Sequence, residues 1–261
     1  MRGIIGNFLS ENSLKQFPVG SPSYFAAQKQ LILKRRALKW CYDCWYARLL
    51  DDARSVSRPG VFLELGSGGG YLKDVEPSVI TSDVIEGVAD KVVDGRNLPF
   101  PDETVAAIFL THVFHHIPDV SRFFSEADRV LVPGGVISLI EVSHTPFGRF
   151  FFRNFHPEPY CDDVESWSFS QRDSMMDSNQ ALSWVVFVRD RTTFEALYPN
   201  LEIESFSYLP WFSYLAAGGV TGRYLVPGFL GHIPPIFDYL LSPLSPILAL
   251  HWHIRIRKKT L

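Results

Sequence analysis

The sequence predicts an α/β fold built around a largely parallel β-sheet, and three observations support this. First, short apolar runs alternate with helix-like stretches between residues 61 and 142. Second, the first apolar run, Val61–Leu65, leads directly into a turn that contains four glycines. Third, later apolar runs end at acidic residues, Asp83 and Asp94. Strands that alternate with helices form parallel sheets, which bind ligands at the carboxyl ends of their strands.

Seven segments have the apolar or alternating pattern of strands. The expected strands are Val61–Leu65, Ser78–Asp83, Lys91–Val93, Val105–Leu110, Val136–Val142, Leu201–Tyr208 and His251–Arg257. Expected helices are residues 24–56, as one long helix or two, Val120–Leu131 and Arg191–Tyr198, with short helices in the proline-rich stretch 210–248 and a loop-rich segment at 143–189.

The first expected helical region carries many basic residues, among them Lys34, Arg35 and Arg36. We expect them to form a solvated helix face, with contact to an anionic surface as the alternative. Three regions follow from these patterns: an N-terminal helical region at 1–59, a ligand-binding core at 60–142, and a remainder at 143–261 that completes the sheet.

The connection between the second and third expected strands is unusually short. Only ten residues separate Asp83 from Asp94, which is too few for a crossover helix between parallel strands. The sheet is therefore expected to lack one covering helix at this point. An apolar sheet face exposed to water is unfavourable and promotes association. We therefore expect either the N-terminal helix or a second subunit to cover it.

Composition excludes several classes of protein. The chain has 261 residues, a net charge of −3 and 46% hydrophobic residues, which gives no indication of nucleic-acid binding. The first residues lack the pattern of a signal peptide. The three cysteines, Cys41, Cys44 and Cys161, form no disulfide framework, which favours a cytoplasmic protein. Cys41 and Cys44 have the spacing of metal ligands but no second pair, so no metal site is expected.

The longest stretch without charged residues, 205–222, contains Pro210 and three glycines. It is therefore not expected to be a transmembrane helix. Peripheral contact with a membrane and formation of a homodimer stay open.

The glycine turn after Leu65 indicates the kind of ligand. Glu64 lies within the apolar run, where a charge is costly unless it has a partner. Glycines allow the backbone to approach a ligand closely. A carboxylate beside bare backbone amides suits a ligand with a cationic or polyhydroxyl part and suits a pyrophosphate poorly. Asp83, at the end of the second strand, can accept hydrogen bonds from ribose hydroxyls, or can simply cap a turn.

Two further motifs extend this pattern, namely Leu98-Pro-Phe100 after the third strand and Arg129-Val-Leu-Val-Pro-Gly-Gly135 before the fifth. Together, residues 60–142 resemble class I S-adenosylmethionine-dependent methyltransferases, particularly the type 11-like group. The resemblance implies a Rossmann-like, largely parallel seven-stranded sheet with an antiparallel last strand. It also implies S-adenosylmethionine as the cofactor.

The resemblance assigns cofactor roles by position. Glu64, Gly66, Ser67 and Gly68 would line the amino-acid part of the cofactor, Asp83 would hold the ribose, Asp94 and Gly95 would lie near the adenine, and Leu110 and Thr111 would flank the methionine moiety. The alternative role for Asp94 is that of a turn residue beside Gly95.

Several residues at the same edge of the sheet could act as a general base for a hydroxyl acceptor. The candidates are His115 and His116 after the fourth strand, and His144 after the fifth, with His112 and Glu141 nearby. The alternative is that these histidines cap a helix or pack locally.

Two segments, 143–189 and 210–248, are rich in aromatic residues and would rise from the cofactor edge. Among their aromatic residues are Phe147, Phe150, Phe151, Phe152, Phe155, Tyr160, Trp167, Phe169, Trp184, Trp211, Phe212, Tyr214, Phe229 and Phe237. They predict an amphiphilic or lipid-linked acceptor, or else only the core of a lid. The stretch Gly218–Pro227 resembles methyltransferases of bacterial surface-polysaccharide or glycolipid biosynthesis, which makes a sugar hydroxyl the first acceptor hypothesis.

Two other functions are compatible with the pattern. A nicotinamide-dependent oxidoreductase would require a third glycine where Tyr71 stands, and Glu64 would crowd a phosphate. A binding or scaffold protein could keep the fold and the cofactor residues without turnover.

Overall fold

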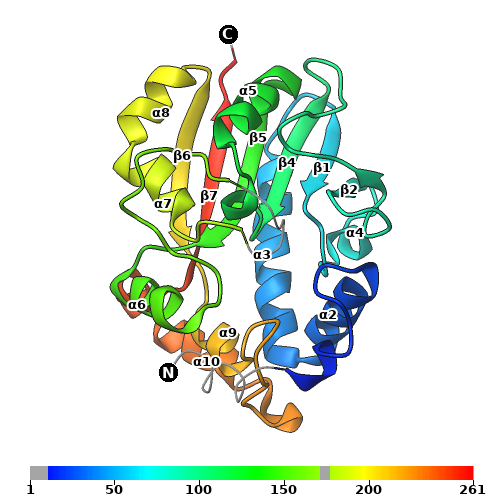
Figure 1. Ribbon diagram of the computed structural model, residues 1–261, viewed down its shortest axis with the longest axis vertical. Coiled ribbons are helices and arrows are strands. Elements are labelled where there is room, and N and C mark those ends of the chain that lie inside the picture. The colour runs from blue at the N-terminus through cyan, green and yellow to red at the C-terminus, as the bar shows by residue number, and fades with distance from the viewer. Residues whose placement is uncertain (1–10, 171–176, 261) are drawn as a thin grey trace.

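A computed structural model describes residues 11–170 and 177–260, and Figure 1 shows their arrangement. Within these residues, seven strands form one sheet in the order β3-β2-β1-β4-β5-β7-β6. The strands are β1 Val61–Leu65, β2 Val79–Asp83, β3 Lys91–Val92, β4 Val105–Thr111, β5 Leu131–Val142, β6 Leu201–Tyr208 and β7 His251–Lys258. Strand β7 runs in the opposite direction to the other six, so its pairings with β5 and β6 are antiparallel and the remaining pairings are parallel. The predicted Rossmann-like fold class is confirmed.

Helices surround the sheet and extend beyond its carboxyl edge, where α6, α9 and α10 lie at the lower end of Figure 1. The α-helices are α2 Pro22–Lys34, α3 Arg36–Arg54, α4 Leu72–Val75, α5 Val120–Val130, α6 Pro146–Phe155, α7 Leu182–Trp184, α8 Arg191–Leu197, α9 Phe212–Ala216, α10 Pro234–Leu240 and α11 Ser245–Leu248. Shorter turns of helix are η1 Asn12–Leu14, η2 Phe114–His116, η3 Val185–Arg189, η4 Gly228–Leu230 and η5 Ser242–Leu244. In the part of the chain that the structure describes, none of the helices has the length and apolar character needed to cross a membrane.

Strand β4 shows how the sequence builds a core on both faces of the sheet. Its side chains alternate between faces, as the period of two requires. Ala107 and Phe109 pack with α3, which passes behind the sheet in Figure 1. Ile108 and Leu110 pack in the opposite direction, with α5, η3 and α8. A central strand buried on both faces is apolar nearly throughout, as this one is from Val105 to Leu110.

The short connection between β2 and β3 has the predicted consequence. Residues 84–90 form turns and bends without a helix. Tyr24 and Phe25 of α2 pack with Ile85 and Val88 of this connection. Of the two expected covers, the structure therefore shows the N-terminal helical region.

The N-terminal helical region is two helices, separated at Arg35. Its guanidinium Nη1 donates hydrogen bonds to the carbonyl oxygens of Gly219 and Gly222, at 3.0 and 2.8 Å, and Nη2 forms an ion pair with Glu11. Arg35 is buried, so the expectation of a solvated basic face is wrong for this residue. A buried cation is tolerated here because acceptors surround it.

Two boundaries differ from the prediction. Strand β5 begins at Leu131, because a register shift between Val105 and Ala107 lets pairing continue past the Val132–Gly135 turn. The segment expected to be loop-rich contains α6, which starts at a Thr-Pro pair: the Thr145 hydroxyl accepts from the N–H of Gly148, and proline is the first helical residue. That cap is a recognised start signal for a helix.

A buried polar network joins α3 to the sheet. Oδ2 of Asp52 accepts hydrogen bonds from the Ser138 hydroxyl, at 2.6 Å, and from Nε2 of His253, at 2.8 Å. Oδ1 lies 3.3 Å from Nη1 of Arg255. Burial alone would raise the pKa of Asp52, but these partners outweigh it and lower the pKa. The carboxylate is therefore ionised and fully engaged.

We predict that Asp52→Ala lowers the free energy of unfolding by about 3–5 kcal/mol, because it leaves buried donors without their acceptor. Urea denaturation followed by circular dichroism measures this. Asp51→Ala is the matched control: Asp51 is exposed on the same helix and, among the described residues, its carboxylate pairs only with Arg54, so its loss should change stability by less than about 0.5 kcal/mol. Equal effects of the two substitutions would contradict a structural role for Asp52.

Candidate active site

A cavity of about 650 Å³ opens at the carboxyl edge of the sheet. Its wall combines the ends of β1, β2 and β4 with residues of α2, α3 and the two aromatic-rich segments. Of the candidates, those that line it are Glu64, Gly66, Ser67, Gly68, Asp83, Asp94, Gly95, Thr111, His115 and His116. The structure thus brings together most of the residues predicted from strand ends.

The glycine turn after β1 has little room for side chains. Gly66 has a φ of +63°, and a Cβ there would lie 2.5 Å from Cγ2 of Val113. A Cβ on Gly70 would lie 2.8 Å from the hydroxyl of Tyr46, which also accepts a hydrogen bond from the N–H of Tyr71. The turn therefore needs glycine for both its conformation and its packing. Backbone atoms of this turn therefore face the cavity without side chains to cover them.

Glu64 is the chemically distinctive residue of this turn. It is buried, with 2% of its surface exposed, and burial raises its pKa to about 7. Within the described residues it forms no ion pair. A cation bound beside it would restore the ionised form, since an opposite charge favours the carboxylate. The ammonium and sulfonium of S-adenosylmethionine are such cations, so the residues present fit this cofactor.

Asp83 shapes the same region. Its Oδ2 accepts from the N–H of Gly68 at 3.1 Å, and its Oδ1 accepts from the N–H of Ile85 at 3.0 Å. The carboxylate therefore joins the glycine turn to the β2–β3 connection, as a turn residue would, and it also lines the cavity. Each oxygen keeps further acceptor capacity. The ribose role stays a prediction.

Asp94 lines the cavity while its carboxylate forms a bidentate pair with Arg96, with Oδ2 2.6 Å from Nη2. Thr111 lines the cavity as well, and its buried hydroxyl has no hydrogen-bond partner among the described residues. Leu110 is different: its side chain packs in the core against α5 and is absent from the cavity wall. Side chains alternate along β4, so Leu110 and Thr111 point to opposite faces.

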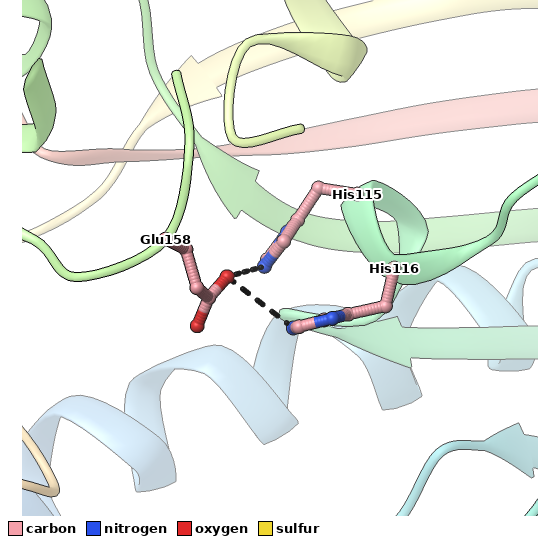
Figure 2. A group of neighbouring side chains, drawn as sticks. All are labelled: His115, His116 and Glu158. Carbon is pink, nitrogen blue, oxygen red and sulfur yellow. Dashed lines mark ion pairs between the residues drawn. The ribbon is translucent and has the colours of Figure 1, made fainter. Parts of the chain in front are cut away.

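Two neighbouring histidines and a glutamate meet beyond the cofactor edge (Figure 2). Nδ1 of His115 lies 2.6 Å from Oε2 of Glu141, and Nε2 lies 3.5 Å from Oε2 of Glu158. Nε2 of His116 is also 3.5 Å from that oxygen. Burial alone would lower the pKa of His115, but the two carboxylates outweigh it and raise the pKa. His115 therefore holds a proton at neutral pH, which does not suit it as a base.

The other imidazoles of the cavity are neutral. Burial, together with the neighbouring charge of His115, lowers the pKa of His116. Burial lowers the pKa of His112 to about 4 and lowers that of His251 as well. Nε2 of His112 and Nδ1 of His251 are buried and have no hydrogen-bond partner in the described parts of the chain. A ligand with hydroxyl groups would satisfy them.

His144, the third catalytic candidate, does not lie with His115 and His116 at the cavity. Its Nδ1 is 2.6 Å from the hydroxyl of Tyr160, and its ring stacks on Trp184 with centroids 4.0 Å apart. It is absent from the cavity wall. His144 lies two residues after the end of β5, beyond the part of the chain that borders the cavity.

The aromatic-rich segments contribute less to the cavity than expected. Among their aromatic residues, only Phe152 and Tyr214 line it. Trp167 is buried in the core, with Phe169 and Trp184 packed against it. Much of the aromatic content is therefore ordinary core.

Sequence reasoning also missed cavity residues. Glu158, Gln180 and His251 line the wall, and they come from segments far from the cofactor motifs. No local pattern marks them. Glu158 lies between two prolines, which predicts only an extended loop.

Comparison with known proteins agrees with this geometry. Residues 63–139 match the model of a family described as a methyltransferase domain, of the type 11 group. The chain therefore contains a methyltransferase domain of the class I, S-adenosylmethionine-dependent type. This match and Glu64 together set aside the oxidoreductase alternative.

Individual relatives are distant. The chain is 27% identical over 181 residues to 2-methyl-6-phytyl-1,4-hydroquinone methyltransferase 2 of Oryza sativa subsp. japonica, covering 58% of this chain and 52% of that protein. It is 31% identical over 136 residues to a probable S-adenosylmethionine-dependent methyltransferase of Mycolicibacterium smegmatis, and the match covers 43% of this chain and 53% of that protein. The chain thus spans about half the length of these curated relatives.

Among solved structures, geranyl diphosphate C-methyltransferase from Streptomyces coelicolor A3(2) is similar in fold. The TM-score is 0.50 and the identity 16%, over 96% of this chain and 88% of that one. This likeness concerns the fold alone.

We predict that the affinity for S-adenosylmethionine falls as pH drops below about 7. The raised pKa of Glu64 means that the free protein must release a proton before the carboxylate can pair with a cation. Isothermal titration calorimetry should give affinity about tenfold weaker at pH 6 than at pH 8. Glu64→Gln should bind more weakly at every pH, with no such dependence. A flat profile for the unsubstituted protein would contradict the role of Glu64.

Proposed function

We propose that the protein transfers the methyl group of S-adenosylmethionine to a hydroxyl of an amphiphilic acceptor. One observation carries this proposal: a single cavity joins the glycine turn and Glu64 to a compartment lined by aromatic and neutral imidazole rings. The cofactor supplies an electrophilic methyl group. The protein holds the acceptor oxygen in line with it, which by itself accounts for much of the acceleration.

The acceptor compartment supports a hydroxyl-bearing ring. Tyr214 contacts His251, with ring centroids 4.5 Å apart, and His251 contacts His112 at 4.6 Å. Aromatic faces pack on a ring, while the two unpaired imidazole nitrogens can bind its hydroxyl groups. His116 is the better of the two adjacent histidines for accepting a proton, because it is neutral.

A lipid-linked acceptor is supported by the surface beyond the carboxyl edge. Helix α6 contacts α11, and α10 and α11 both contact η5, so these helices form one continuous end of the molecule. Large apolar side chains are exposed on them and on η4. They are Phe150, Phe155, Phe229, Ile236, Phe237, Tyr239, Leu240, Leu244 and Ile247. Such surfaces mark contacts with membranes or with other proteins, so both peripheral membrane contact and a homodimer belong to this proposal.

The first acceptor candidate is a sugar hydroxyl on a glycan or glycolipid precursor, from the resemblance of Gly218–Pro227. The second is a hydroquinone that carries a long hydrocarbon chain. It is favoured by the aromatic and imidazole wall, and by the relatives named as hydroquinone and demethylmenaquinone methyltransferases, the latter 30% identical over 101 residues in Symbiobacterium thermophilum.

An acceptor screen tests the proposed activity. The protein is incubated with S-adenosylmethionine and either glycolipid precursors or chain-bearing hydroquinones, and products are sought at one added methyl group by mass spectrometry. Cofactor binding is measured in parallel by calorimetry. Binding without turnover on either acceptor class would favour the scaffold alternative. Absence of binding by folded protein would overturn the proposal.

We predict that the apolar end binds lipid vesicles. Replacing Tyr239 and Leu240 of α10 by glutamate should weaken partitioning into vesicles by roughly tenfold or more, since it removes two apolar side chains from the contact. The control places glutamate at Val188 of η3 and Leu197 of α8, which are apolar and exposed at 44% and 57%, against 81% for Tyr239 and 62% for Leu240. Helix α8 lies away from the apolar end (Figure 1). Co-sedimentation measures the effect, and light scattering reports any dimer. Equal loss in both variants would contradict a lipid-binding end.

A further inference from the structure

We propose that His115, His116 and Glu158 bind one divalent transition-metal ion on the wall of the acceptor compartment. The three side chains come from two segments that are distant in sequence: η2, after β4, and the loop after α6. All three line the cavity. Figure 2 shows a ring nitrogen of each histidine facing the same carboxylate oxygen of Glu158.

The spacing of the ligand atoms suits a small cation. One atom from each residue lies within 4.8 Å of the others, and Oε2 of Glu158 is 3.5 Å from Nε2 of both histidines. Zinc binds imidazole nitrogen at about 2.0–2.1 Å in a tetrahedron, which places ligand atoms roughly 3.3 Å apart. The two distances from Glu158 are already close to this value, so the adjustment needed is a rotation of the two imidazole rings that brings their nitrogens closer to each other.

His115 is oriented as a ligand, and a bound metal would displace the proton that its Nε2 holds in the free protein. Its Nδ1 donates to Oε2 of Glu141, because an ionised carboxylate can only accept. Oε1 of Glu141 accepts from the N–H of Phe114 at 2.8 Å, so the carboxylate is fixed at both oxygens. Metal-binding histidines commonly donate their second nitrogen to a carboxylate in this way, which fixes the tautomer and directs the other nitrogen to the ion.

Glu158 is oriented as well. Its Oε2 accepts from the Ser178 hydroxyl at 2.9 Å and from the side-chain amide of Gln180. The surrounding loop is fastened by the backbone, since the N–H of Asn179 donates to the carbonyl of His115 at 2.9 Å. The same short segment, 178–180, therefore positions both sides of the site. Hydrogen-bonded ligand carboxylates are a regular feature of metal centres.

The donor set indicates the class of metal. Two imidazoles and one carboxylate suit zinc and other first-row transition metals, whereas magnesium and calcium prefer oxygen ligands. Three protein ligands leave at least one position open, as in catalytic zinc sites. Here that position faces the cavity, where water or an acceptor oxygen can bind. If the proposed function holds, the metal would polarise the acceptor hydroxyl beside the methyl group, in place of a base at His116, whose Nε2 would then bind the metal.

Metal binding is tested directly on tag-free, chelator-treated protein. Calorimetry with Zn²⁺ should show one site, and Co²⁺ should give the visible absorption of a nitrogen- and oxygen-coordinated ion. Glu158→Gln and His116→Gln should each weaken Zn²⁺ binding by at least about 100-fold. His144→Gln is the matched control, because His144 lies nearby but faces Tyr160 outside the cavity; it should bind Zn²⁺ as the unsubstituted protein does.

Glu141→Gln tests the positioning contact. The glutamine oxygen can accept from Phe114, but its amide would then face Nδ1 of His115 and favour the tautomer with the proton on Nε2. We expect about 10–100-fold weaker Zn²⁺ binding with the stoichiometry kept at one. Stoichiometry separates this effect from loss of a ligand, and circular dichroism confirms the fold of each variant.

The proposal is overturned if folded, unsubstituted protein binds neither Zn²⁺ nor Co²⁺ at a single site, or if either ligand substitution leaves binding unchanged. In that case the cluster is only an imidazolium held between two carboxylates. Binding of S-adenosylmethionine is measured on the same samples. Because Glu64 and the glycine turn are separate from the three ligands, Glu158→Gln should retain cofactor binding, and this distinguishes failure of the metal site from failure of the proposed function.

Discussion

The buried carboxylate of Glu141 is the contact on which both halves of the cavity depend. It lies near the end of β5, fully buried, and engages the backbone of Phe114 and the ring of His115 at once. This fixes the path of the chain immediately after β4. One side of that path, at Val113, packs against the glycine turn. The other side presents His115 and His116 to the acceptor compartment.

Glu64 and Glu141 lie at the ends of strands in the same sheet and are equally buried, yet their environments act in opposite directions. Burial raises the pKa of Glu64, which forms no ion pair with any of the described residues. For Glu141 burial acts in the same direction, but the His115 imidazolium outweighs it and lowers the pKa. One carboxylate is thus prepared to receive a charged ligand, and the other is satisfied by the protein itself. The difference separates a binding group from a positioning group.

The short connection between β2 and β3 determines which helix reaches the cavity. With no helix over residues 84–90, α2 packs there and brings Phe25 and Gln28 to the cavity wall. Arg35, at the break between α2 and α3, is held by carbonyl groups of the segment that also supplies Val220 and Thr221 to the cavity. The N-terminal helices therefore serve as cover, and they join the cofactor edge to the C-terminal segment.

The sequence could predict what depends on local pattern. The apolar alternation predicted the strands, and the spacing of Asp83 and Asp94 predicted a missing helix. The glycines after Leu65 predicted a close backbone approach, because only glycine adopts positive φ at Gly66 without strain. Helix α6 was missed although the Thr-Pro pair at its start is a local signal.

Other features depend on contacts between distant segments and could not be predicted in this way. His115 and His144 have the same chemistry and follow adjacent strands, yet one meets two carboxylates in the cavity and the other stacks on Trp184 outside it. Glu158 has no motif at all, and its position is set by hydrogen bonds to residues 178–180. By itself, then, the sequence determined the sheet and the cofactor edge, because those follow from periodicity and turn chemistry. Only the tertiary structure decided which polar side chains share a cavity, because packing sets their orientation.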